Sequence, residues 1–354
     1  RNLGSSDNRN TVHSRRKMDV SAPILIWGAG AIGGSLGAAF IRAGHDVVMV
    51  DNVSTHVDMI NQKGLRIVGP VFEDVVKTSA YLPENLPGEY DQIFLCVKAL
   101  HTETATRTLM PHLADNGMVV SAQNGLNEDT IARIIGVKRT IGCFVNFGAD
   151  YLEPGVVTYG GRGAMVIGEL NGEKTDRIVA LHELMCDFES NSVLTSNIWG
   201  YLWGKLIYAA LLFATALTDD SIADVLDNLA VRNLLTRLGQ EVGTVADSEA
   251  VKTESFDGFN PFAFRPDVPQ GALDQSFDDM VAHNRRSTKS HSGIWRDLAV
   301  RKRKTEAEAQ LGPIIKVGQK NGIATPLTSR LMAMVLEIEA GDRRLGMENL
   351  KELT

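Results

Sequence analysis

The sequence has few cysteines and no excess of basic residues. Three cysteines, Cys96, Cys143 and Cys186, occur in 354 residues, and no two of them have CxxC spacing. An odd number without that spacing indicates neither a disulfide framework nor a zinc site, so we expect three reduced thiols and no metal. Lysine and arginine number 36 against 43 aspartate and glutamate residues, giving a formal net charge of −7. Such a chain is a poor general partner for nucleic acid or an anionic membrane.

Long apolar runs are also scarce. One stretch, IWGYLWGKLIYAALLFATAL (Ile198–Leu217), is long enough to suggest a membrane span, but Lys205 interrupts it and no second span follows. We therefore interpret it as a buried helix. Residues 1–17 are polar and basic, so we expect a disordered extension that cannot serve as a secretory signal. These features favour a cytoplasmic protein.

Apolar runs alternate with helix-length segments over residues 23–150. The candidate strands are Ile24–Trp27, Val47–Asp51, Gln92–Val97, Gly117–Gln123 and Thr140–Phe147. Continuous apolar strands of this kind indicate a parallel sheet that is covered on both faces. The β-rich, glycine-punctuated stretch Val156–Leu170 predicts further edge strands that close the domain.

The pattern after about Ser190 is helical. Helices are predicted at Ile198–Leu217, Ile222–Gly239, Gly293–Gly322 and Pro326–Gly341. Between the second and third of these, the Pro/Gly/aromatic segment Phe256–Phe277 is expected to form a loop that could close over a ligand. The predicted fold is α/β: an N-terminal Rossmann-type parallel-sheet domain (residues 18–190) and a C-terminal all-α domain (residues 191–354).

A glycine-rich turn joins the first strand to a small-residue helix. Gly28, Gly30 and Gly33 fit GxGxxG, in which the first glycine permits the tight turn and the second lets backbone approach a pyrophosphate. The third allows close packing of helix on strand. The free N–H groups of the helix N-terminus favour an anion there. We therefore predict that the whole turn binds a dinucleotide; its other members are Ala29, Ala31 and Ile32.

Asp51 ends the second predicted strand about 20 residues further on. A carboxylate at this position accepts hydrogen bonds from the ribose hydroxyls of NAD and repels the 2′-phosphate of NADP. Its neighbour Asn52 is neutral. The cofactor is thus NAD or NADP, with NAD favoured, although a cation from a nearby loop could reverse that preference.

Several ordered motifs resemble those of the ketopantoate reductase (2-dehydropantoate 2-reductase) family. FLCVKALHTETATRTLMPHL places a lysine after the fourth strand, and VVSAQNGLNED places QNG after the fifth. WGKLIYAALLFATALT resembles the W-x-K-L helix of the family, and KTEAEAQLGPIIKVGQKNGIATP resembles its R-x-T-E…G-I-x-T-P segment. The resemblance covers about residues 24–341. It implies an NAD(P)-dependent reductase of a small 2-keto acid, in the pantothenate pathway and as a possible homodimer.

The resemblance also implies roles for individual residues. Lys98 approaches the cofactor, Asn124 lies beside nicotinamide and substrate, Lys205 is the catalytic lysine, and Glu306 is a carboxylate near the reacting centre. Hydride delivery to a ketone develops negative charge on oxygen, which a cationic donor stabilises. Burial in an apolar helix is expected to lower the pKa of Lys205, and a neighbouring acid to raise it again.

Each of these residues also has a structural interpretation. Lys205 could extend its ammonium to the surface, and Glu306 could belong to a solvated face within the charge run RKRKTEAEAQ. Asn124 could be a turn residue of its Asn-Gly pair, and Lys98 could have a capping or surface role.

Two segments depart from the family pattern. The family carries asparagines four and eight residues after the catalytic lysine, where this chain has Ala209 and Phe213. The family aspartate precedes the glutamate by eight residues, whereas Asp297 precedes Glu306 by nine. Ser292 is the best candidate for the substrate-binding serine, and His291 and Arg296 could supplement it. All three could instead be ordinary loop or cap residues.

The departures leave two further functions open. One is an NAD-dependent dehydrogenase of a different 2-hydroxy acid on the same fold, which Ala209 and Phe213 suggest. The other is a non-catalytic nucleotide-sensing protein, against which the presence of both Lys205 and Glu306 argues.

Overall fold

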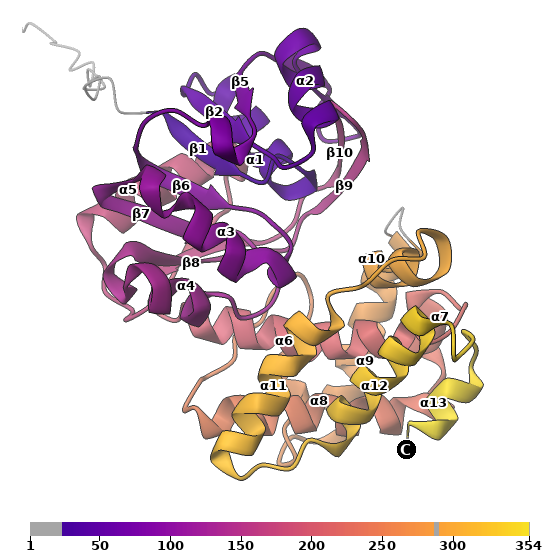
Figure 1. Ribbon diagram of the computed structural model, residues 1–354. Coiled ribbons are helices and arrows are strands. Elements are labelled where there is room, and N and C mark those ends of the chain that lie inside the picture. Colours follow the sequence, from indigo (N-terminus) through magenta and orange to yellow (C-terminus); the bar gives the residue numbers. More distant parts are fainter. Residues whose placement is uncertain (1–22, 287–289, 354) are drawn as a thin grey trace, which may run out of the picture.

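The computed structural model describes residues 23–286 and 290–353, so the extension expected at residues 1–17 lies outside the described residues. The chain forms an α/β domain and a helical domain, which Figure 1 shows in indigo to pink and in salmon to yellow. This agrees with the fold class predicted from the sequence.

The main sheet has the strand order β12-β11-β8-β7-β6-β1-β2-β5. Its strands are β1 (Ile24–Trp27), β2 (Val47–Val50), β5 (Ser79–Tyr81), β6 (Tyr90–Leu95), β7 (Leu113–Ser121), β8 (Thr140–Val145), β11 (Met165–Glu169) and β12 (Val193–Leu194). Neighbours pair in parallel from β5 through β8, and β11 joins β8 antiparallel. The short strand β12 continues the sheet beyond residue 190, the boundary that the sequence suggested.

Helices cover both faces of this sheet, as its continuous apolar strands require. Ile24 and Ile26 of β1 face α1 (Ala31–Arg42) and α5 (Asp176–Phe188), while Leu25 and Trp27 face α3 (Thr102–Leu109) and α4 (Glu128–Ile135). Short 3₁₀ helices occur at Pro83–Asn85, Ala99–His101, Met110–His112 and Val137–Arg139.

A second sheet packs against α1 in the order β4-β3-β10-β9. Its strands are β3 (Leu65–Val68), β4 (Asp74–Val76), β9 (Gly148–Glu153) and β10 (Val156–Gly161), and α2 (Ser54–Lys63) precedes β3. The predicted run Val156–Leu170 is therefore divided between two sheets: β10 lies in the interior of the small sheet and β11 in the main one. The expectation of simple edge strands was wrong, because the glycine-rich turn between them lets the chain change sheets.

The helical domain is built around α6 (Ile198–Thr215). The others are α7 (Ile222–Asp227), α8 (Leu229–Ser248), α9 (Gln270–Arg286), α10 (Gly293–Trp295), α11 (Ala307–Asn321), α12 (Pro326–Ala340) and α13 (Glu348–Glu352), with a 3₁₀ turn at Pro261–Phe264. By length and composition α6 could cross a membrane, but 72% of its residues are buried inside the protein. Figure 1 shows α6 where the two domains meet.

Two helical predictions require correction. The helix expected at Ile222–Gly239 is two helices, because the Asn228 side chain accepts a hydrogen bond from Ala230 N–H and caps α8. The helix expected at Gly293–Gly322 is α10, a π-helical turn (Arg296–Val300), an irregular stretch, and then α11. Lys302 in the irregular stretch has φ of +49°, which a right-handed helix does not allow.

The aromatic segment Phe256–Phe277 is not a lid. It includes the 3₁₀ turn and the first half of α9, and its aromatic side chains Phe256, Phe259, Phe264 and Phe277 are buried in the core of the helical domain. The sequence pattern was misleading because aromatic residues that fill a core in an irregular segment have no helical periodicity.

Candidate active site

A cavity of about 790 Å³ lies between the two domains. On the sheet side it is formed by segments that follow the carboxyl ends of parallel strands: Gly28 after β1, Asp51 after β2, Val97 after β6 and Asn124 after β7. Ligands bind at this edge of open α/β sheets. The helical domain contributes side chains from α6, α10 and the segment that leads into α11; these are Lys205, Tyr208, Ala209, Leu212, Ser292, Ile294, Asp297, Arg301, Arg303, Thr305, Glu306 and Gln310.

The glycine turn fits a dinucleotide. Gly28 has φ of +99°, and Gly30 has no heavy atom within 4 Å of the position a Cβ would take, so backbone is open to the cavity at the start of α1. Gly33 packs against β1, since a Cβ there would lie 2.7 Å from the Ile26 side chain. Ala31 and Ile32 line the cavity, whereas Ala29 is fully buried and does not line it.

Asp51 lines the same end of the cavity, and its orientation is fixed. One carboxylate oxygen accepts a hydrogen bond from Ala29 N–H (3.0 Å) and the other from Val53 N–H (3.0 Å). Each oxygen retains a lone pair for a further donor, such as a ribose hydroxyl. The adjacent lining residues Asn52 and Val53 carry no charge.

Lys205 reaches the cavity from the middle of α6. Its ammonium donates a hydrogen bond to Asn124 Oδ1 (2.8 Å) and another to the Val145 carbonyl. Burial lowers the pKa of Lys205 to about 8, while the charges of Glu306 and Asp257 act to raise it. The lysine therefore changes protonation state near neutral pH, as a group that exchanges a proton with substrate must.

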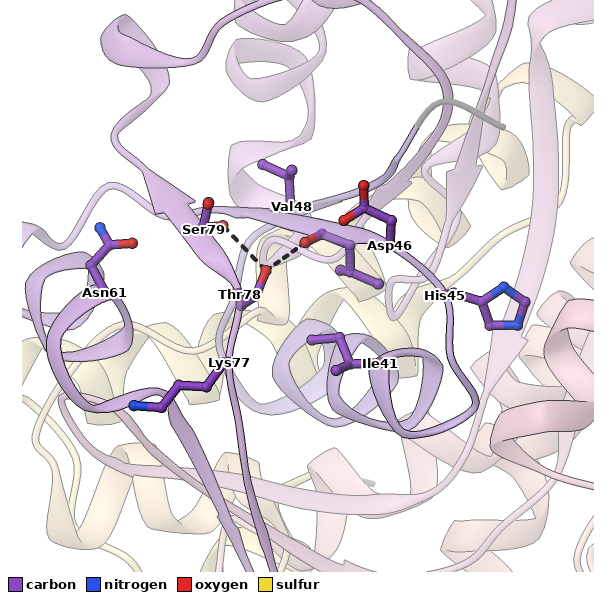
Figure 2. A pocket seen from close by; sticks show the side chains of 9 residues that line it. Ile41, His45, Asp46, Val48, Asn61, Lys77, Thr78 and Ser79 are labelled. Atoms are coloured by element: carbon purple, nitrogen blue, oxygen red, sulfur yellow. Dashed lines mark hydrogen bonds between the residues drawn. The ribbon is translucent and has the colours of Figure 1, made fainter. Parts of the chain in front are cut away.

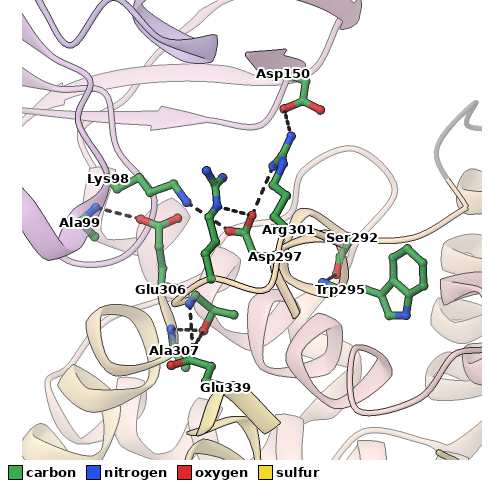
Figure 3. A network of polar contacts seen from close by, with 12 residues as sticks. Lys98, Ala99, Asp150, Ser292, Trp295, Asp297, Arg301, Glu306, Ala307 and Glu339 are labelled. Carbon is green, nitrogen blue, oxygen red and sulfur yellow. Dashed lines mark hydrogen bonds and ion pairs between the residues drawn. The ribbon is translucent and has the colours of Figure 1, made fainter. Parts of the chain in front are cut away.

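Glu306 also lines the cavity and lies directly before α11. Its Oε1 accepts a hydrogen bond from Ala99 N–H of the α/β domain (2.8 Å), shown in Figure 3. Lys205 and Glu306 share no hydrogen bond in the described structure, so the carboxylate acts on the lysine through its charge alone.

A buried polar network, which the sequence did not reveal, supports Asn124. Asn127 Nδ2 donates to the Asn124 carbonyl (2.7 Å), and Asn127 Oδ1 accepts from Thr102 (2.9 Å). Thr102 in turn accepts from Gln123 Nε2 (2.9 Å). Gly125 has φ of +90°, so Asn124 also belongs to a tight turn, as its Asn-Gly pair indicated. The turn and the network together hold the main chain of Asn124, whose side-chain amide oxygen accepts the hydrogen bond from Lys205.

Ion pairs connect the domains beside the cavity (Figure 3). Lys98 after β6 pairs with Asp297 (3.1 Å), and Asp150 of β9 pairs with both Arg296 (2.9 Å) and Arg301 (2.8 Å). Burial alone would raise the pKa of Asp297, but Lys98 and Arg303 lower it below its usual value. Lys98 thus lines the predicted cofactor cleft and also connects the α/β domain to the helical domain through its ion pair with Asp297.

The π-helical turn explains the nine-residue spacing of Asp297 and Glu306. Arg301 N–H donates to the Arg296 carbonyl five residues back (2.8 Å), which is the π-helical pattern. Such a turn accommodates one residue more than an α-helical turn. The π-helical turn therefore has room for the extra residue, and both carboxylates line the cavity.

Not all of the residues predicted to bind substrate line the cavity. Ala209 and Ser292 line the cavity, and Ser292 also caps α10 by accepting from Trp295 N–H (3.2 Å). Phe213 is fully buried in the helical core and does not line the cavity, which contradicts its predicted contact with substrate. The lining positions are Tyr208 and Leu212, three and seven residues after Lys205, because i+7 lies closer to the lysine's helix face than i+8.

The two residues suggested to supplement Ser292 have other partners. His291 hydrogen-bonds the Asp219 carbonyl (3.0 Å) and its ring contacts that of Trp295 in a tilted arrangement, and Arg296 is paired with Asp150. Neither lines the cavity.

A second hollow lies away from this cavity. Figure 2 shows it at the opposite end of the main sheet, near Thr78, whose hydroxyl donates to the Val47 carbonyl. No group of three potential metal ligands occurs in residues 23–286 and 290–353. The three cysteines are free thiols, of which Cys143 is buried.

Comparisons with known proteins decide the family. The model described as ketopantoate reductase PanE/ApbA matches residues 24–172, and the model of its C-terminal domain matches residues 197–339. The chain belongs to the ketopantoate reductase family. As a member of it, the protein is an NAD(P)-dependent oxidoreductase that acts on CH–OH groups.

Relatives cover nearly the whole chain. The 2-dehydropantoate 2-reductases of Archaeoglobus fulgidus and Pyrococcus abyssi are 29% and 28% identical over 320 residues, which is 90% of this chain and 98% of each relative. A crystal structure of a PanE/ApbA family ketopantoate reductase from Ralstonia eutropha superposes with a TM-score of 0.75 at 26% identity, covering 90% of this chain and 99% of that one. A D-mandelate dehydrogenase solved with NADH and anilino(oxo)acetate has a TM-score of 0.77 at 20% identity and covers 90% and 99%; it shows the shared fold.

Proposed function

We propose that the protein reduces a small 2-keto acid reversibly to the 2-hydroxy acid, with Lys205 as proton donor. One observation carries the proposal: the Lys205 ammonium lies in the interdomain cavity, is hydrogen-bonded to Asn124, and has a pKa of about 8. A nucleotide-sensing protein without catalysis does not need a buried lysine there, since desolvating an ammonium costs free energy.

The site's own residues account for the proton and for orientation. A nicotinamide dinucleotide on the glycine turn would supply the hydride. Lys205 then gives its proton to the carbonyl oxygen as negative charge develops on it, and Asn124 holds the ammonium in place. Glu306 keeps more of the lysine protonated near neutral pH by its charge. Ser292 is the proposed hydroxyl donor to the substrate carboxylate.

NAD is the proposed cofactor, because the Asp51 carboxylate is fixed at the ribose end of the turn and has uncharged neighbours. A 2′-phosphate would meet this carboxylate without a compensating cation from Asn52 or Val53. The cytoplasm as location and a homodimer as assembly remain proposals.

Ketopantoate is the first candidate substrate, because the curated relatives carry the name 2-dehydropantoate 2-reductase. A different 2-keto acid is the second candidate, favoured by Ala209 and Leu212, which line the cavity beside Lys205.

The decisive experiment follows NADH and NADPH oxidation with ketopantoate and a panel of 2-keto acids. We expect turnover with at least one keto acid, with NADH preferred, and a loss of orders of magnitude in Lys205→Ala while NADH still binds. Lys205→Ala turnover equal to that of the parent protein would refute the role of the lysine. NADH binding with no keto acid reduced would instead support the nucleotide-sensing alternative.

A further inference from the structure

The cavity wall beyond Lys205 is apolar. Lys205, Tyr208, Ala209 and Leu212 line the cavity at positions i, i+3, i+4 and i+7 of α6, which place them on one helix face. Ile294 of α10 lines the same cavity. A keto acid whose carbonyl oxygen meets the ammonium would therefore direct one of its two substituents along the methyl and aliphatic groups of Ala209, Leu212 and Ile294, with the Tyr208 ring beside them.

The carboxylate is the substituent less suited to that surface. Charged groups lose hydration against an apolar wall and gain most from charge-assisted hydrogen bonds. The cavity also offers such partners: the Ser292 hydroxyl, and the Arg303 guanidinium, which among the described residues donates only its Nε–H, to Asp297 (2.8 Å). The substrate side chain is thus left to face the apolar wall.

Two polar side chains that also line the cavity are already engaged in hydrogen bonds. Tyr208 Oη accepts a hydrogen bond from Asn284 Nδ2 (3.3 Å), which leaves its O–H as the one donor besides Lys205 among the described residues of this helix face. Asn146 Nδ2 donates to Asp257 Oδ2 (2.6 Å). A substrate hydroxyl placed against Ala209 and Leu212 would lose its water without gaining a partner from them.

We propose that the cavity selects 2-keto acids with an entirely apolar side chain and that Ala209 and Leu212 are its specificity-determining residues. The inference rests on the proposed function and narrows its substrate class.

A pair of substrates that differ by one hydroxyl tests the inference. Ketopantoate carries a hydroxymethyl group where 3,3-dimethyl-2-oxobutanoate carries a methyl group, and the two are otherwise identical. We expect kcat/KM to be about tenfold to a hundredfold higher for the deoxy compound, because an apolar pocket discriminates against an added hydroxyl by about that factor. Equal or better use of ketopantoate would overturn the inference and leave the proposed function intact. Failure of both compounds, and of 4-methyl-2-oxopentanoate and phenylglyoxylate, in protein that binds NADH would instead overturn the proposed function.

Matched variants test the two residues. Ala209→Asn introduces an amide one turn from Lys205, and Ala209→Leu adds a side chain of similar shape without polar atoms. We expect the asparagine to raise the ratio of ketopantoate to deoxy kcat/KM at least tenfold and the leucine to leave it unchanged. Thermal unfolding and NADH binding establish that each variant is folded. If Ala209→Asn does not fold, Leu212→Asn replaces it in the test, because Leu212 is partly exposed and tolerates a polar side chain better. An unchanged ratio in a folded asparagine variant would overturn the assignment.

Discussion

The protonation state of Lys205 gives a quantitative prediction for the pH dependence of keto acid reduction. With a pKa of about 8, the lysine is about 90% protonated at pH 7 and about 10% protonated at pH 9. Only the protonated form can supply the proton, so kcat/KM for the keto acid should fall about tenfold between these pH values. An exposed lysine, with a pKa of about 10.4, would leave the rate almost constant over the same range.

The assay measures initial rates at saturating NADH from pH 6 to pH 10 in buffers of constant ionic strength. Glu306→Gln removes a negative charge that raises the pKa of Lys205, so its falling limb should move to lower pH. Glu128 is the control, because burial raises its pKa to about 7. Glu128→Gln should leave the limb near pH 8. Two results would refute the assignment of the proton to Lys205. One is a kcat/KM of the unsubstituted protein that stays constant up to pH 10. The other is a falling limb that moves in Glu128→Gln but not in Glu306→Gln.

Three other measurements test separate parts of the structure. Asp51→Asn should weaken NADH binding tenfold or more, since hydrogen bonds to a charged group contribute about 1.5–3 kcal/mol. Fluorescence titrations of the protein with NADH and with NADPH measure both affinities. An equal loss of affinity for the two nucleotides would contradict the contact between Asp51 and the ribose. The pKa of Glu128 is raised on folding, so its contribution to stability is complete below about pH 4.5 and is lost as pH rises through about 7. Denaturant unfolding should show a loss of up to about 3 kcal/mol over that range, which Glu128→Gln abolishes. Phe213→Leu should cost about 1 kcal/mol of stability and leave substrate preference unchanged, whereas a changed preference would return this residue to the substrate site.

Local chemistry made much of the α/β domain predictable. The central strands and the glycine turn have short-range signals, namely apolar runs of strand length and three glycines at fixed spacing. The two-residue strand β12 has no such signal and exists only because β11 is beside it. Similarly, Asn228 ends one helix and caps the next through a single side-chain contact, which apolar periodicity does not record.

The site was predictable where a residue acts on its immediate surroundings. An apolar helix was enough to predict the lowered pKa of Lys205, because desolvation needs no specific partner. The pairing of Asp150 with Arg301 joins residues 151 positions apart, and nothing in either local pattern indicates the other. The prediction that Phe213 contacts substrate failed for a simpler reason. Phe213 follows Lys205 by eight residues, which on a helix is 80° past two full turns, so its side chain points into the core and not into the cavity.

The two titratable groups proposed for proton handling are both secured by the neighbouring domain. Lys205 depends on Asn124 and the Val145 carbonyl, and Glu306 depends on Ala99 N–H, all of which belong to the α/β half. Exchange of the helical half for that of a relative, as a route to new substrates, would therefore retain proton transfer only if the incoming lysine and carboxylate still met Asn124, the Val145 carbonyl and Ala99 N–H of the α/β half. For this scaffold, redesign of substrate range is better confined to the α6 wall, where side chains can be replaced without disconnecting the two halves.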